Sequence, residues 1–263
     1  MVPAVLSAVA PWKHAVVLVA AVAGGFVNSI AGGGSLLTFP ALVWVGIPPV
    51  AASATNTVGL WPGSVGGVVG FRRHLPERRV IILLGVPSLI GGIVGAVLLL
   101  RTPQQVFEGL APVLVFLATV LLAVQDPLSK RISRGGVVGD GSPGFATAAV
   151  VFQFLVGVYG GFFGAGIGIM MLAALAILGL TDIHEMNALK NLLAIAINGV
   201  AAVYFVTRGA VLWTDAALMA AGSIAGGLAA ASLAHRLGRR LVRQAVIAIG
   251  IAASVSLLLK FFG

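Results

Sequence analysis

The chain of 263 residues contains no cysteine and few charged residues, which make up 9% of it and include seven acids. The lack of cysteine excludes disulfides, thiolate metal sites and a cysteine nucleophile. About a quarter of the residues in a soluble domain are usually charged, so this shortage argues against water as the main solvent. The acids fall in or beside the breaks between apolar runs, where a lipid environment tolerates them.

Sites for metals, cofactors and enzyme chemistry are also missing. The four histidines lie at segment ends without metal-ligand spacing, and the chain offers no Ser/His/Asp arrangement and no phosphate loop. No carboxylate lies in the middle of a span, which argues against an acidic proton relay or a carboxylate-lined cation path. The formal net charge of +9 is spread over short basic clusters between apolar stretches. Such clusters are typical of membrane topology signals and contacts with anionic lipid headgroups, and we expect no nucleic-acid binding.

Long apolar runs dominate the chain. Eight of them are long enough to cross a hydrocarbon core of roughly 30 Å at about 1.5 Å per helical residue, and they span 15–33, 50–70, 80–100, 106–124, 146–165, 186–206, 214–233 and 244–262. The first run has no clear cleavage site, so we interpret it as a retained span rather than a signal peptide. Two shorter segments, 34–46 and 167–180, follow Gly-rich stretches. About 13 residues form only about 20 Å of helix, which predicts broken or re-entrant helices.

The chain resembles itself at a shift of 135 positions, at which Gly25 matches Gly160 and Asn56 matches Asn191. This echo indicates an internal duplication. We expect residues 1–124 and 145–263 to form two transmembrane repeats of about five helical segments each. The segment 125–144 has the Gly, Pro and basic composition of a linker. The predicted fold is therefore an all-α polytopic membrane protein with broken or re-entrant Gly-rich helices.

The distribution of basic residues predicts how the repeats are oriented. If all ten segments cross, one face receives 12 of the Lys and Arg residues and the other receives four. The positive-inside rule makes the first face cytoplasmic, together with the linker, and leaves both termini outside. An odd number of crossings per half turns the second half upside down. The loop Arg72–Arg79 is strongly basic and its counterpart around Arg208 is not, which favours inverted-topology repeats.

The Gly-rich breaks are the first candidate binding site. Backbone that leaves the helical conformation inside a membrane must be buried in protein or line a hydrated cavity. Amides at the N-terminus of a half-helix carry partial positive charge and bind anions. These arguments select Gly33, Gly34, Gly166 and Gly168. The alternative is that the glycines only allow close helix packing.

Polar side chains inside apolar spans form the second candidate site. At the repeat shift, Thr55 matches Lys190 and Asn56 matches Asn191. If the repeats are inverted, Asn56 and Asn191 approach a shared centre from opposite faces. Their hydrogen-bonding groups either bind a ligand or fix helix packing. Further candidates at the first break and along the second Asn-bearing helix are Asn28, Ser35 and Asn198.

Lys190 is the most specific of these candidates. It lies about one turn into its span, near a helix N-terminus where the helix dipole disfavours a cation. Either a bound anion offsets this cost, or the side chain reaches the cytoplasmic interface or pairs with Asp182 or Glu185.

Several spaced motifs in both halves resemble the sulfite exporter TauE/SafE family of membrane permeases. In the first half they span Gly25–Ser35 and Ala52–Asn56, and in the second half Gly160–Gly168 and Asn187–Asn191. The resemblance extends over nearly the whole chain. It implies a bacterial-type carrier of the inner membrane for sulfite, sulfoacetate or other sulfonates.

Charge, repeats and resemblance together predict a permease rather than an enzyme. We expect a small anion to bind near the bilayer midplane, between the Gly-rich breaks and the Asn-bearing helices, with alternating access from the two faces. Two alternatives stay open. One is a channel or carrier for another small solute, and the other is a membrane sensor or interaction subunit.

Overall fold

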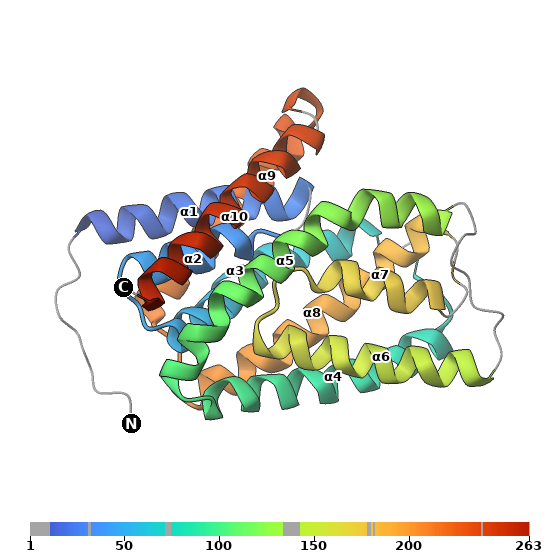
Figure 1. Cartoon of the computed structure of the whole chain (residues 1–263). Coiled ribbons are helices and arrows are strands. Elements are labelled where there is room, and N and C mark those ends of the chain that lie inside the picture. The colour runs from blue at the N-terminus through green and yellow to red at the C-terminus, as the bar shows by residue number, and fades with distance from the viewer. Residues whose placement is uncertain are drawn as a thin grey trace.

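The chain folds into a bundle of helices (Figure 1). The computed structural model describes residues 11–30, 33–71, 75–133, 143–177, 180, 182–237 and 239–262. These residues form ten helices and no strand, which confirms the predicted all-α class. The helices are α1 (Pro11–Ile30), α2 (Ser35–Trp44), α3 (Pro49–Phe71), α4 (Arg78–Arg101), α5 (Gln104–Ser133), α6 (Pro143–Phe162), α7 (Ile167–Ile177), α8 (Ile183–Thr207), α9 (Trp213–Leu237) and α10 (Arg239–Phe262).

The helices have the length and surface of a multi-pass membrane protein. Within the described residues, five are long and apolar enough to cross a bilayer, namely Pro11–Ser29, Arg78–Arg101, Gln104–Gln125, Glu185–Thr207 and Arg240–Phe261. The helices α3 and α9 reach similar lengths, with 23 and 25 residues. Large apolar side chains such as Ile82, Phe116 and Leu259 are exposed on the outside of the bundle, as expected for a surface that faces lipid.

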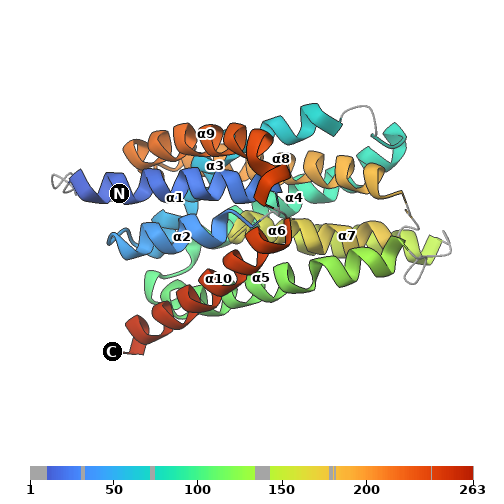
Figure 2. The ribbon, with the colours of Figure 1, turned by 90° about the horizontal axis from the view of Figure 1, so that it is seen from above.

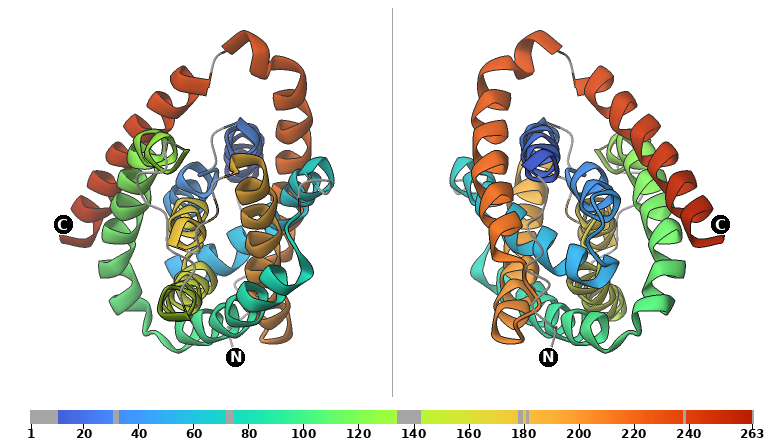
Figure 3. Two further views of the ribbon diagram at one scale, coloured as in Figure 1. Left: turned by 90° about the vertical axis from the view of Figure 1, so that its right-hand side faces the viewer. Right: turned by 90° about the vertical axis from the view of Figure 1, so that its left-hand side faces the viewer.

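The two short helices α2 and α7 lie in opposite halves of the bundle, inside the longer helices (Figures 2 and 3). They contain 10 and 11 residues, too few to cross alone, as the sequence predicts. Each follows a break with a glycine at positive φ, +86° at Gly33 and +79° at Gly166. Only glycine adopts this conformation at little cost. The carbonyl of each of these glycines accepts a hydrogen bond from the amide three residues later.

The two ends of the bundle differ in the elements that reach them. The start of α1, the turn between α4 and α5 and the end of α10 lie at one end, which we call the turn end (Figure 1, left). The end of α5 and the start of α6 lie at the other, which we call the linker end. Helix α5 continues to Ser133, so helix occupies the first part of the predicted linker 125–144. Residues 134–142 lie outside the described residues, and the division into two domains stays a prediction.

Equivalent helices of the two halves pack in equivalent ways. Helix α1 packs mainly on α9, and α6 packs mainly on α4. At the first interface Gly25 lies against the carbonyl of Ser223, and at the second Gly157 lies against the carbonyl of Ser88. Glycine allows this backbone contact, and small residues commonly bring membrane helices together in this way.

The structural correspondence differs from the sequence echo near the start of each half. The echo matches Gly25 with Gly160, whereas the packing matches it with Gly157. The reason is a difference in length: α9 begins 70 residues after α6 (213 − 143), but α4 begins 67 residues after α1 (78 − 11). A shift of 132 therefore relates α1 to α6, and a shift of 135 relates α4 to α9. The inverted orientation of the halves in a membrane stays a prediction.

Candidate functional site

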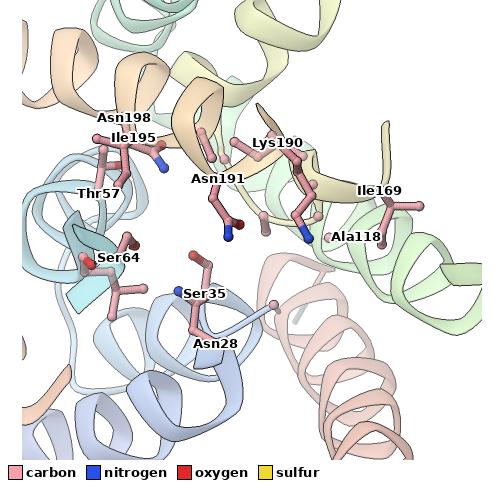
Figure 4. A pocket seen from close by; sticks show the side chains of 18 of the residues that line it. Asn28, Ser35, Thr57, Ser64, Ala118, Ile169, Lys190, Asn191, Ile195 and Asn198 are labelled. Atoms are coloured by element: carbon pink, nitrogen blue, oxygen red, sulfur yellow. Dashed lines mark hydrogen bonds between the residues drawn. The ribbon is translucent and has the colours of Figure 1, made fainter. Parts of the chain in front are cut away.

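A cavity of about 380 Å³ lies where the two Gly-rich breaks meet α3, α5 and α8 (Figure 4). Both halves of the chain contribute to its wall. Nine of the eleven predicted site residues line it, namely Asn28, Gly33, Ser35, Asn56, Gly166, Gly168, Lys190, Asn191 and Asn198. The structure thus gathers residues that are up to 170 positions apart (198 − 28) around one space.

Helix α8 presents a polar stripe to the cavity. Asn187, Lys190, Asn191, Ala194 and Asn198 all line it. Spacings of three and four residues place side chains on one face of a helix. Asn187 was not among the predicted site residues, yet this spacing could have identified it.

The facing wall belongs to α3. Asn56, Thr57, Trp61 and Ser64 line the cavity from this helix. The indole Nε1 of Trp61 donates a hydrogen bond to the carbonyl of Ile195 on α8 at 3.1 Å, which joins the two halves across the cavity. Nothing in the apolar run around Trp61 distinguishes it from an ordinary core aromatic.

Both breaks lie against α5. A Cβ at Gly33 would lie 3.4 Å from the side chain of Leu122, and one at Gly166 would lie 3.4 Å from Cα of Ala118, one turn earlier. Within the described part of the chain, the backbone amides of Ile167 and Gly168 have no hydrogen-bond acceptor. Such amides in the first turn of a helix are available donors with partial positive charge.

A hydrogen bond between helices orients Asn56. The hydroxyl of Thr38 on α2 donates to Oδ1 of Asn56 at 2.5 Å, and both side chains are buried. Because Oδ1 is engaged, the amide Nδ2 is the group of Asn56 that can donate to a ligand. Thr38 was not predicted from the sequence, since a threonine in an apolar helix usually bonds its own backbone.

Lys190 carries charge into the cavity wall. Its Nζ donates a hydrogen bond to Oδ1 of Asn187 at 2.9 Å, and its side chain points toward the cavity between Asn191 and Ala118 (Figure 4). The alkyl chain lies against Gly168, where a Cβ would come within 3.2 Å of Cδ of Lys190. Glycine at position 168 therefore makes room for the lysine.

Several other polar side chains face the cavity without a partner among the described residues. Asn28, Ser35, Asn191 and Asn198 make no side-chain hydrogen bond to the residues that the structure describes. Asn191 and Ser35 point toward each other across the space from α8 and α2 (Figure 4). Their donors and acceptors are available to a ligand or to water.

Two predicted residues lie outside the cavity wall. Gly34 is buried because its Cα packs on the carbonyl of Gly24, which leaves no room for a side chain. Thr55 is fully buried, and its hydroxyl accepts a hydrogen bond from the amide of Leu212 at 3.1 Å. Both residues pack helices together, the alternative that the sequence left open.

The described wall of the cavity carries charge of one sign. Of the described residues that line it, Lys190 alone carries a formal charge, and none is a carboxylate. The described residues also hold no group of three histidine, aspartate or glutamate side chains suited to a metal ion. Amides, hydroxyls and one ammonium group can donate hydrogen bonds to an anion.

The model of the family described as sulfite exporter TauE/SafE matches residues 16–257. The chain belongs to this family. TauE/SafE membership confirms the resemblance seen in the sequence and makes the protein a membrane transporter.

Curated proteins that resemble the chain are also named as transporters. A probable membrane transporter protein of Haemophilus influenzae is 30% identical over 213 residues, which cover 76% of each chain. The probable membrane transporter protein YfcA of Escherichia coli K12 is 28% identical over 218 residues, 81% of this chain and 78% of YfcA. A probable membrane transporter protein of Sinorhizobium sp, ORF9, is 29% identical over 212 residues. No solved structure matches the chain.

Proposed function

We propose that this TauE/SafE transporter moves a small sulfur oxyanion or organosulfur anion, such as sulfite or a sulfonate, across the inner membrane. The observation that carries the proposal is Lys190, the single charged side chain among the described lining residues, in a cavity whose other polar groups are amides, hydroxyls and an indole. A sulfite or sulfonate head group offers three oxygen acceptors, which suit an ammonium group and several amide donors.

In this proposal each half of the chain supplies part of the site. The ammonium of Lys190 supplies charge, Asn56 and Asn191 donate hydrogen bonds, and the first-turn amides at Gly168 point at the anion. The volume of about 380 Å³ leaves room for an organic tail beside Trp61 and Ile195. The equivalent packing of α1 on α9 and of α6 on α4 supports inverted repeats that rock against each other.

Binding measurements on the purified protein test this function. Isothermal titration calorimetry measures the affinities for sulfite, sulfoacetate, taurine and acetate. These ligands differ in their anionic head group and in their organic tail. A hydrogen bond to a charged group contributes about 1.5–3 kcal/mol, so we expect Lys190→Gln to weaken binding of the preferred anion by at least about tenfold. Asn56→Ala and Asn191→Ala should each weaken it by a smaller factor.

Arg208→Gln is the matched control. Arg208 is exposed at the far end of α8, where it stacks on Tyr204 at 5.1 Å, and it does not line the cavity. Its loss should leave affinity unchanged. If Asn56→Ala, Asn191→Ala and Lys190→Ala all leave the affinity for sulfonates unchanged, the assignment of this site is wrong.

A further inference from the structure

A second hollow of about 310 Å³ lies toward the turn end of the bundle. Its wall comes from the corner between α2 and α3, the start of α5 and the end of α10. We call it the turn-end groove and define it by Val43, Gly46, Glu108, Ala111 and Lys260. The groove has no part in the binding site described above.

A cluster of aromatic rings adjoins the central cavity, whose wall includes Phe163. The ring of Phe39 on α2 packs edge-on against Phe163 at 5.1 Å and against Phe107 at 6.4 Å. Phe107 in turn packs against Phe162 at 5.4 Å. These four rings form what we call the aromatic layer, and Phe39, Phe107 and Phe163 are at most 3% exposed.

Helix α2 connects the three regions in order. Ser35 lines the cavity, Phe39 belongs to the aromatic layer, and Val43 lines the groove. Successive members are four residues apart, so they lie on one face of the helix about 6 Å from each other along its axis. On this face of α2, Phe39 therefore lies between a residue that lines the cavity and a residue that lines the groove.

The opposite side of the cavity is polar. Gln125 and Asn187 line it toward the linker end. Asn187 is four residues from the start of α8 at Ile183, about 6 Å along the helix axis. The cavity wall thus has polar groups toward the linker end and includes one ring of the aromatic layer, Phe163.

We propose that the aromatic layer is the closed gate of the transport path and that the turn-end groove is the outlet beyond it. A layer of packed aromatic rings offers an anion no hydrogen bonds and excludes water. The described structure is then the conformation closed toward the turn end. The gate depends on the proposed function in one respect: the central cavity must bind the transported solute.

Helix α2 is the element that can open this gate. Glycines at positive φ flank it, Gly33 at +86° and Gly46 at +97°. Residues at the ends of an element commonly absorb the backbone change in a closing motion. A movement of α2 about these glycines would separate Phe39 from Phe163 and Phe107 together.

The groove beyond the gate is polar at its mouth. Nζ of Lys260 donates a hydrogen bond to the carbonyl of Val43 at 3.4 Å, and Nε2 of Gln104 donates one to Glu108 at 3.0 Å. An ion that passes the rings would therefore meet the charged side chains of Lys260 and Glu108.

Thiol accessibility tests the gate without any substrate. The native chain has no cysteine, so Ala194→Cys, on the cavity wall, provides one reporter. In vesicles of each orientation, a membrane-impermeant thiol reagent should modify this reporter from the linker-end face only. Minor conformations are typically populated at about 0.1–10%, so Phe39→Ala should raise the rate from the turn-end face by roughly tenfold or more.

Phe205→Ala is the matched control. Phe205 is a fully buried ring on α8 that packs on Tyr204, outside the aromatic layer. Its truncation should leave turn-end modification slow. If Phe39→Ala does not fold, as judged by gel filtration and by linker-end reactivity, Phe39→Leu and Phe107→Leu provide milder variants with the same expected direction.

Two results would overturn the gate. One is fast modification from the turn end with the native rings present, and the other is slow modification in every folded variant of the aromatic layer. The readout does not depend on the anion. If turn-end modification accelerates in the aromatic-layer variants but sulfonates fail to bind, only the proposed substrate is refuted. If sulfonates bind but turn-end modification stays slow in these variants, only the gate is refuted.

Discussion

Thr38 and Asn56 join α2 to α3 through a hydrogen bond of 2.5 Å in which the threonine hydroxyl donates to the amide oxygen. Thr38 is adjacent in sequence to the gate residue Phe39, and Asn56 lines the central cavity. One contact thus links the proposed gate to the proposed anion site.

The first prediction is that Thr38→Val weakens anion binding. Valine keeps the shape of threonine but removes the donor that orients Asn56. Such a hydrogen bond contributes about 0.5–1.5 kcal/mol, so the dissociation constant should rise by roughly two- to tenfold, as measured by titration calorimetry. Thr119→Val makes the same change at a buried threonine that bonds its own helix through Val115 at 2.7 Å. Equal losses in the two variants would argue against a role for Thr38 in orienting Asn56.

The second prediction concerns the space that Gly168 leaves for Lys190. An added Cβ would lie 3.2 Å from Cδ of Lys190 and would displace the lysine side chain. We expect Gly168→Ala to weaken anion binding with little change in thermal stability. Gly85→Ala is the control, because no atom lies within 4 Å of a Cβ built there. If both variants bind the anion like the native protein, the position of Lys190 does not depend on Gly168.

The third prediction distinguishes the effect of backbone strain on stability from the effect of the Gly-rich break on anion binding. Gly166 has φ of +79°, and Gly209 has φ of +65° in a turn with no atom near its missing Cβ. Alanine in a left-handed conformation costs roughly 1–2 kcal/mol. We expect Gly166→Ala and Gly209→Ala to lose similar stability in thermal unfolding. Only Gly166→Ala should also weaken anion binding, and a loss of binding in Gly209→Ala would contradict this.

The fourth prediction tests whether the two halves pack equivalently. Gly226 on α9 lies against the carbonyl of Val22, and Gly91 on α4 lies against the carbonyl of Phe154. A methyl group at either position forces two helix backbones apart, and such overpacking costs about 1–3 kcal/mol. Gly226→Ala and Gly91→Ala should therefore lower the unfolding temperature by comparable amounts, whereas Gly85→Ala should not. Destabilisation of one variant alone would show that the interfaces are not equivalent.

Periodicity and composition predicted most of the fold. The lack of charge and the apolar runs indicated membrane helices, and the Gly-rich stretches indicated the breaks before α2 and α7. Hydropathy could not show that helix continues to Ser133, because the polar end of a helix and a polar linker have similar compositions. The shift of 132 in the first helices was hidden because the echo at 135 aligned neighbouring glycines by chance.

The residues that line the cavity could be predicted in part. Asn56, Lys190 and Asn191 line the cavity because polar groups within apolar spans seek other polar groups. Thr55 lies next to Asn56 in sequence but turns away from the cavity toward Leu212. Neighbouring helical residues point in different directions, and only the position of the partner helix decides which of them faces the ligand.

The sequence by itself determined that the protein lies in a membrane, its family, the positions of the Gly-rich breaks, and Lys190 as the charged side chain of the candidate site. These properties are local, since charge, hydropathy and glycine content act residue by residue. The tertiary structure alone decided that Thr38 holds Asn56, that Gly168 makes room for Lys190, and that Phe39 packs against Phe107. Each of these is a contact between helices, and its existence depends on how the helices rotate and approach one another.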